Sequence, residues 1–95
     1  MRQLDSEKLD VWKRSCRLFC EVYKELNDCK NSGFEDQLTR SALSIASNIA
    51  EGAEWETANE SARFLYIAKG SAGEAITQLY IGVEAGFVEK QKHSY

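Results

Sequence analysis

The chain has 95 residues, of which 43% are hydrophobic and 28% charged, and its formal net charge is -3. This length predicts one globular domain of marginal stability, because so short a chain buries only roughly 60–65% of its unfolded surface. The negative charge argues against a general attraction to nucleic-acid phosphates or anionic lipids. No apolar run reaches the ~20 residues of a membrane span, and the first ten residues lack the apolar core of a signal peptide. We therefore expect a cytoplasmic protein with no membrane partner.

The metal-ligating residues are too few for a zinc site. Cys16, Cys20 and Cys29 fall in one predicted helix, and His93 is the single histidine. Cys16 and Cys20, spaced four residues apart, share a helix face, but two thiols without a third or fourth ligand do not hold zinc. Packed or half-exposed reduced thiols are the interpretation that we prefer. We expect neither a metal nor another cofactor.

Two interruptions divide a chain without proline into three predicted helices, residues 7–30, 34–51 and 58–85, followed by a tail over 86–95. Capping boxes are predicted at Ser32 with Glu35 and at Thr57 with Glu60, where a hydroxyl accepts from a backbone amide and the carboxylate reaches back. Gly86 suits the left-handed residue that follows a helix. The whole chain, 1–95, is predicted to be a single helical domain.

The first helix carries an apolar seam and a basic patch. The seam residues are spaced alternately four and three positions apart: Trp12, Cys16, Phe19, Tyr23 and Leu26. A second apolar stripe, Val11, Leu18 and Val22, lies beside them. Such spacing is typical of one face of an antiparallel bundle. The most basic local patch consists of Lys13, Arg14, Arg17 and Lys24. It is interpreted as a solvated helix face or, alternatively, as a nucleic-acid contact.

The second helix has an apolar seam of Leu38, Ala42, Ile45 and Ile49. Its opposite side carries polar residues, several of them small: Arg40, Ser44, Ser47, Asn48 and Glu51. Three interpretations stay open for this polar side. It meets a neighbouring protomer or lines a ring, it forms an internal network in which Arg40 or Asn48 bonds to Glu51 or to Glu74 and Gln78 of the third helix, or it is a ligand or catalytic site.

The third helix is apolar on more than one side. Its predicted core positions are Leu65, Ala68, Ala72, Ile76, Leu79 and Val83, whereas Phe64, Tyr66, Ile67, Tyr80, Ile81 and Ala85 lie largely off that seam. A helix that is apolar most of the way round is normally buried on several sides. Three helices cannot supply that cover, so we expect partner chains, or a further helix in a longer form of the chain, to supply it. Gly70 and Gly73 are predicted to lie where another helix backbone comes close.

Catalysis is not expected. The polar side chains of the second and third helices have no histidine near them to act as a base. The stretch "AKGSAG" at 68–73 lacks both the preceding strand and the spacing of a phosphate loop. Di-metal sites in bundles use a Glu-x-x-His pattern, which this sequence does not contain.

Three stretches together resemble one bacterial family: "LDVWKRS", "QLTRSALSIASNIAEG" and "ESARFLYIAKGSAGEAITQLYIGVEAGFV". They are similar to the S23 proteins, also called 23S rRNA intervening-sequence proteins, over nearly the whole chain. The most specific parts are "SNIAEG", "RFL.IAKGS" and the Leu9, Val11, Trp12 entry. The chain departs from the family in Ala46, where proline is common, and in ending where the family's fourth helix would run.

The resemblance implies an up-and-down four-helix bundle that forms rings, commonly pentamers, with no established catalytic activity. Resemblance to a related branch, the accessory protein of diversity-generating retroelements, would imply a basic pentamer that binds nucleic acid.

The expected fold is therefore an all-α antiparallel up-and-down bundle of the four-helix type, with its fourth helix truncated or absent in this chain. The expected function is that of a non-enzymatic, ring-forming homo-oligomeric scaffold, most simply a pentamer. Its interface or polar network is assigned to Arg40, Ser44, Ser47, Asn48, Glu51, Ile67, Glu74, Gln78 and Ile81. The alternative is an RNA- or DNA-binding accessory protein that uses Lys13, Arg14, Arg17 and Lys24.

Overall fold

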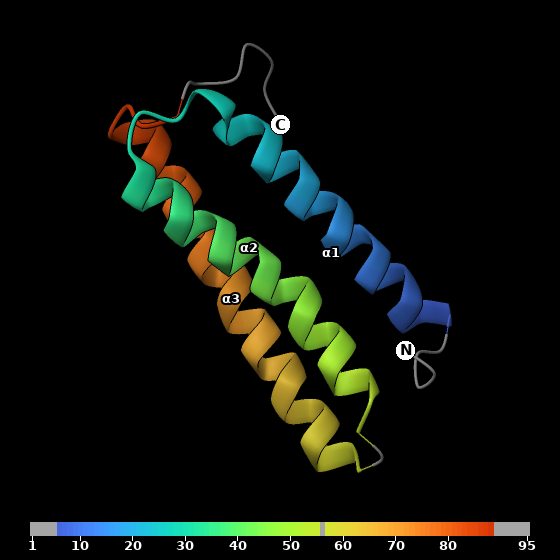
Figure 1. Cartoon of the computed structure of the whole chain (residues 1–95). Helices are drawn as coiled ribbons and strands as arrows, with labels where there is room; N and C mark the ends of the chain where they lie inside the picture. Colours follow the sequence, from blue (N-terminus) through green and yellow to red (C-terminus); the bar gives the residue numbers. More distant parts are fainter. Residues whose placement is uncertain (1–5, 56, 89–95) are drawn as a thin grey trace.

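The computed structural model describes residues 6–55 and 57–88, and every regular element in these ranges is helical. Helix α1 spans Ser6–Glu25 and continues into a short 3-10 helix, η1, over Leu26–Asp28. Helices α2, Ser32–Ala53, and α3, Ala58–Glu84, follow. The chain runs up, down and up again, as Figure 1 shows. The expected all-α antiparallel architecture is confirmed for the described residues.

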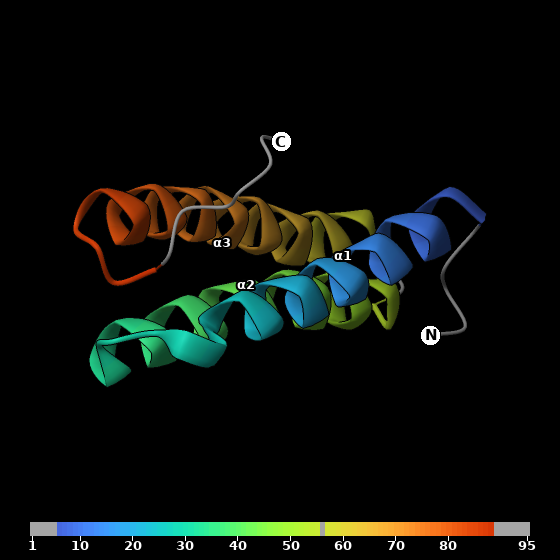
Figure 2. The same ribbon diagram turned by 90° about the horizontal axis from the view of Figure 1, so that it is seen from above.

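Helix α2 holds the structure together. It packs against α1 on one side and α3 on the other, whereas α1 and α3 make almost no contact with each other. Figure 2 shows α1 crossing above α2 while α3 lies in a separate layer. The described chain is elongated, with extents of 44 × 22 × 18 Å. The described residues form three helices, and the expected four-helix arrangement is not confirmed by them.

Local capping fixes where α2 and α3 begin. Asn31, not Ser32, caps α2, because its Oδ1 accepts from the Phe34 amide at 2.9 Å. The predicted cap at Ser32 was therefore wrong by one residue, and Ser32 is the first helical residue. Thr57 caps α3 as predicted, since its Oγ1 accepts from the Glu60 amide at 3.3 Å. Each cap satisfies one of the backbone amides that a helix start leaves without a partner.

The core lies along α2 and the end of α1. Leu26 and Leu38 are its largest fully buried side chains. The predicted α2 seam is confirmed, because Leu38, Ala42, Ile45 and Ile49 are all buried. The predicted α1 seam needs a correction: Tyr23 is exposed, and Ser15 and Val22 are buried instead. The polar Ser15 fits there because its hydroxyl donates to the Val11 carbonyl oxygen at 2.9 Å.

Helix α3 is rotated from the orientation that its apolar seam predicted. Its buried residues are Ala68, Ser71, Ala75 and Gly82. The predicted core positions Leu65, Ile76 and Val83 are exposed. The small residues let α3 approach α2 closely, and this contact leaves most of the large apolar side chains of α3 outside it.

The glycines at this contact are not the ones that the sequence indicated. A Cβ atom at Gly52 would lie 3.1 Å from the Ser61 carbonyl oxygen, and one at Gly82 would lie 2.8 Å from Cε1 of Phe34. At Gly70 and Gly73 an added Cβ would meet no atom of the described chain within 4 Å. The predicted close helix approach at Gly70 and Gly73 is therefore wrong within this chain.

The chain reverses direction after α3. Gly86 has the predicted left-handed backbone, with φ of 80°. The Phe87 amide donates to the Gly82 carbonyl oxygen at 2.9 Å, and the Gly86 amide donates to that of Val83 at 3.2 Å. These two bonds form a Schellman motif. Val88 is consequently buried in the core, at the end of the bundle where α1 also ends.

Candidate functional site

A small polar cluster joins α2 to α3. The Ser71 hydroxyl donates to Oγ of Ser44 at 2.8 Å. The Asn48 side-chain amide donates to both Oγ and the carbonyl oxygen of Ser44, at 2.9 and 2.8 Å. Three short polar side chains therefore satisfy one another inside the helix contact, which fixes the register of the two helices.

This cluster supports the internal-network interpretation for Ser44 and Asn48, with a different partner on α3. The sequence indicated Glu74 and Gln78, whereas the partner is Ser71. Glu74 is exposed. Gln78 lies nearer the core, and its Oε1 is buried without a hydrogen-bond partner in the described structure. The sequence analysis did not single out Ser71, because the glycines on either side of it were taken as the points of close helix approach.

The remaining polar candidates on α2 point outward. Arg40, Ser47 and Glu51 are all exposed. No hydrogen bond or ion pair within the described residues joins them to one another or to α3. They are available to another molecule, but the structure does not assemble them into a catalytic constellation.

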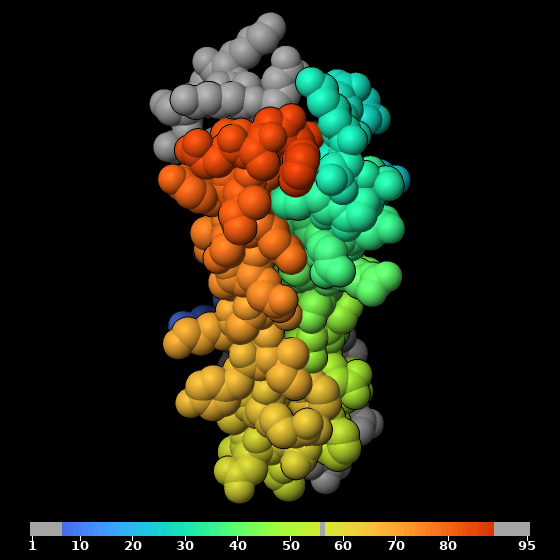
Figure 3. All heavy atoms as spheres, turned by 90° about the vertical axis from the view of Figure 1, so that its left-hand side faces the viewer, coloured from blue at the N-terminus to red at the C-terminus, as the bar shows by residue number. Residues whose placement is uncertain are grey.

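Beside these α2 residues runs a mixed stripe of α3, on the side of the molecule away from α1, in which exposed isoleucines alternate with polar residues. Ile67, Glu74 and Ile81 are spaced seven residues apart, close to two helical turns each, and so share one side of α3. Ile67 and Ile81 are 42% and 50% exposed. We call this surface, Ile67, Glu74, Gln78 and Ile81, the outer face. Figure 3 views the molecule from the left-hand side of Figure 1, with α3 lying beside α2 along its length.

A second apolar surface lies between α1 and α3. Val11 of α1 and Leu65 of α3 line opposite walls of a hollow of about 220 Å³, whose floor includes Ile49. Ile76 and Val83 lie about three and five turns beyond Leu65, on the same side of α3, and Leu18 lies on the same side of α1 as Val11. All five residues are exposed, Ile76 to 68%. We call this surface, Val11, Leu18, Leu65, Ile76 and Val83, the groove.

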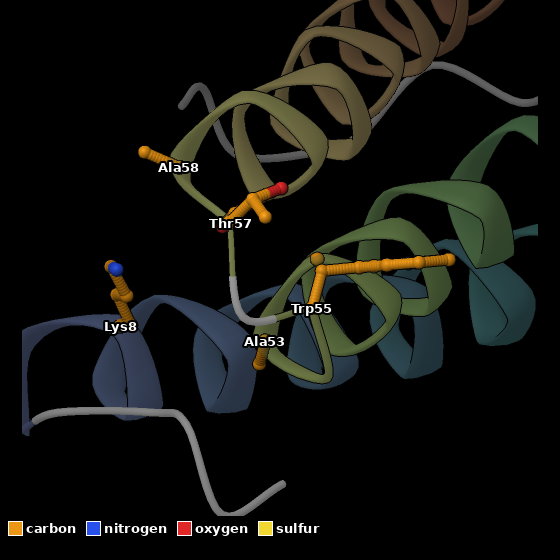
Figure 4. A pocket seen from close by; sticks show the side chains of 7 residues that line it. Lys8, Ala53, Trp55, Thr57 and Ala58 are labelled. Atoms are coloured by element: carbon orange, nitrogen blue, oxygen red, sulfur yellow. The ribbon is translucent and has the colours of Figure 1, made fainter.

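The turn between α2 and α3 forms a smaller polar hollow of about 210 Å³. Figure 4 shows Lys8 of α1 on one side of it and Thr57 and Ala58, at the start of α3, on another. The Trp55 ring stacks on Phe64, with centroids 6.1 Å apart, and the Arg63 guanidinium carbon lies 4.7 Å above the Phe64 ring. These contacts brace the corner between the helices.

The basic residues of α1 lie on its solvent-facing side. Lys13, Arg14, Arg17 and Lys24 are all exposed. Arg14 forms an ion pair with Asp10 at 3.9 Å, so part of its charge is compensated on the same helix. The arrangement leaves both interpretations of this patch in place, a solvated face or a nucleic-acid contact.

Three further observations concern chemistry and location. Cys16, Cys20 and Cys29 are free thiols, and Cys29 is near enough to donate to the Asn31 carbonyl oxygen at 3.4 Å. Among the described residues, no three histidine, cysteine or acidic side chains gather closely enough to hold a metal ion. None of the helices over residues 6–55 and 57–88 combines the length and apolarity that crossing a bilayer demands.

Comparison with known proteins gives one clear result. The family model of the 23S rRNA-intervening sequence protein matches residues 7–95. The match covers all three helices, so the chain belongs to this family, as its sequence motifs indicated. No curated protein matches the chain.

Proposed function

We propose that this member of the 23S rRNA-intervening sequence protein family is a non-enzymatic homo-oligomeric scaffold that assembles into a ring, most simply a pentamer. The observation that carries the proposal is the exposure of apolar side chains on two sides of α3. Ile76 faces the groove and Ile81 the outer face, and both are at least half exposed. Soluble proteins seldom leave such extended apolar surface uncovered as monomers.

The architecture supports assembly for a second reason. In the four-helix bundle that we propose, the groove takes the fourth position, a reading supported by the near absence of contact between α1 and α3. A helix from another molecule, or one that follows Val88 in a longer form of the chain, completes the bundle there. The outer face stays exposed in either case, so a complete bundle still needs an intermolecular contact.

A scaffold also fits the polar residues better than an enzyme does. Ser44, Asn48 and Ser71 bond to one another and leave no hydroxyl beside a general base. The protein is accordingly assigned no catalytic residue and no cofactor. The three free thiols are compatible with a reducing compartment, in keeping with a cytoplasmic location.

Light scattering coupled to size-exclusion chromatography at micromolar concentration tests the proposal. We expect a mass that is a multiple of the chain mass of 10.7 kDa, five-fold for the pentamer. Ile67→Asp should reduce this mass, since burying a carboxylate in an apolar contact removes its hydration without supplying a partner. A wild-type protein that stays at 10.7 kDa would refute the proposal.

The exposed basic patch favours a second candidate function, that of a nucleic-acid-binding accessory protein. Lys13, Arg17 and Lys24 lie on the solvent side of α1, and a ring would repeat the patch so that weak contacts add by avidity. The logarithm of the binding constant for structured RNA should then fall linearly with the logarithm of the salt concentration. Replacing Lys13, Arg14 and Arg17 with glutamine should flatten that dependence and leave helicity unchanged. We favour the scaffold, because the net charge of -3 opposes such binding.

A further inference from the structure

Two of the three cysteines lie together on one side of α1, outside the groove and the outer face. Cys16 is half-buried and Cys20 is exposed, and both are free thiols. Residues four positions apart on a helix are neighbours, with Cβ atoms about 5–6 Å apart. The two thiols therefore form a pair that the helix holds at a fixed spacing and that solvent reaches through Cys20.

This spacing is too long for a disulfide and suits a metal ion bound between the two sulfur atoms. A disulfide needs Cβ atoms about 3.5–4.5 Å apart, which is less than the helical spacing of about 5–6 Å. Two metal–thiolate bonds of about 2.3 Å each place the sulfur atoms up to about 4.6 Å apart, a separation compatible with that Cβ spacing. Helix α1 runs without a break from Ser6 to Glu25, so the two Cβ atoms cannot approach further while the helix is intact.

We propose that Cys16 and Cys20 bind a soft monovalent cation of the Cu(I) type between their two thiolates. Soft thiolate ligands select Cu(I), zinc and iron–sulfur clusters. Structural zinc and the clusters take four protein ligands, and among the described residues no third histidine, cysteine or acidic side chain joins this pair. Two thiols thus exclude zinc, which needs a third and a fourth ligand, but they satisfy an ion that accepts two.

Binding at this site is a ligand exchange without a change of oxidation state. One Cu⁺ replaces the protons of two thiols, so two Cu–S bonds form, two S–H bonds break and two protons leave to water. Two thiolates and one monovalent cation leave the complex with one net negative charge. The surroundings of the pair must therefore stabilise an anion.

Basic residues lie beside the pair at helical spacing. Lys13 precedes Cys16 by three residues. Arg17 precedes Cys20 by three residues, and Lys24 follows it by four. All three basic side chains are exposed, and no carboxylate occupies a position three or four residues from either cysteine. Because positions three and four residues apart face one another on a helix, the local charge favours the anionic complex.

An aromatic surface lies on the other flank of the pair. Phe19 follows Cys16 by three residues and Tyr23 follows Cys20 by three, and the two rings stack with centroids 6.1 Å apart. Apolar surroundings limit the access of water and strengthen the attraction between thiolates and a cation. The site therefore favours a soft ion over a strongly hydrated one.

Anaerobic titration of the whole chain with Cu(I), in competition with a chromophoric Cu(I) chelator, tests the proposal. We expect one ion per chain for the wild-type protein and for Cys29→Ser, the control that removes the thiol outside the pair. Cys16→Ser and Cys20→Ser should each lose more affinity than the about 10–100-fold that loss of an outer-shell group costs, because each removes one of the two ligands. Serine is close to cysteine in size, so circular dichroism should show the same helicity in all four proteins.

Three results would overturn the proposal: no uptake of Cu(I) by the wild-type protein, undiminished uptake by Cys16→Ser or Cys20→Ser, or one ion for every two chains. The last would indicate an ion held between single thiols of two subunits. Zinc supplied in the same way should not bind, and zinc uptake equal to that of Cu(I) would overturn the assignment to a two-coordinate ion. The site lies within one helix, so its failure leaves the proposed scaffold intact, and a monomeric protein that binds Cu(I) refutes the scaffold alone.

Discussion

The contact between Gly82 of α3 and the Phe34 ring is a sensitive point for the packing of α2 against α3. A Cβ atom at position 82 would lie 2.8 Å from Cε1 of Phe34 and 3.1 Å from Cγ2 of Val88. The Phe34 ring cannot retreat freely, because it packs against Phe87 with ring centroids 5.3 Å apart. The substitution Gly82→Ala therefore forces at least one buried group to move.

The expected magnitude comes from two opposing effects. Alanine favours an interior helix position over glycine by about 1 kcal/mol. Overpacking a well-filled site costs roughly 1–3 kcal/mol. The matched control is Gly73→Ala in the same helix, where the propensity gain is the same and an added Cβ meets nothing within 4 Å. We expect the free energy of unfolding of Gly82→Ala to be about 1–3 kcal/mol lower than that of Gly73→Ala. The helix-propensity gain cancels in this comparison, so the difference reports the cost of overpacking.

Urea unfolding followed by far-ultraviolet circular dichroism measures this difference. All variants must be compared at one protein concentration, because assembly adds to apparent stability. In a Phe34→Leu background the alanine at position 82 should cost less, since the clashing ring atoms are gone; a double-mutant cycle isolates that coupling. Equal stability of Gly82→Ala and Gly73→Ala would refute the close packing of Phe34 on α3.

Two further substitutions test the core and the helix start. Leu38→Ala should destabilise the protein by about 2–5 kcal/mol because Leu38 is fully buried, whereas Leu43→Ala on the same helix, where Leu43 is half exposed, should cost far less in the same urea titration. Asn31→Ala should cost about 0.5–2 kcal/mol through loss of the cap on the Phe34 amide, and Ser32→Ala should be nearly neutral; similar losses for both would contradict the cap assignment.

The sequence predicted the number, order and approximate limits of the helices because the relevant signals are local. Thr57 and Gly86 act through backbone groups within a few residues, and both behaved as predicted. The predicted end of the first helix, residue 30, was too late, since α1 ends at Glu25 and a 3-10 turn follows. Asn31 then takes the capping role that the pattern assigned to Ser32.

The orientation of α3 could not be predicted from periodicity. A helix with apolar residues on nearly all sides has no single hydrophobic direction, so its contact side is decided by how closely α2 can approach. The side of α3 that packs against α2 is the one that carries Ser71, Ala75 and Gly82, because their small side chains allow tighter packing. Leu65 and Ile76 lie outside this contact. The same reasoning explains the polar side of α2: Ser44 and Asn48 lie in a close helix contact, where the Ser44 hydroxyl oxygen accepts from the Asn48 side-chain amide and from the Ser71 hydroxyl.

This choice of contact side has a consequence for stability. Because α3 meets α2 through small residues, several of its large apolar side chains stay partly exposed within one chain, and full burial of Ile76, which is 68% exposed, would add about 1–2 kcal/mol. Folding and assembly should therefore be coupled, and the thermal midpoint of the wild-type protein should rise with protein concentration. Ile67→Asp, which places a carboxylate on the outer face, should abolish that rise. A wild-type midpoint that is the same over a hundred-fold range of concentration, measured by circular dichroism, would show that α3 needs no second molecule.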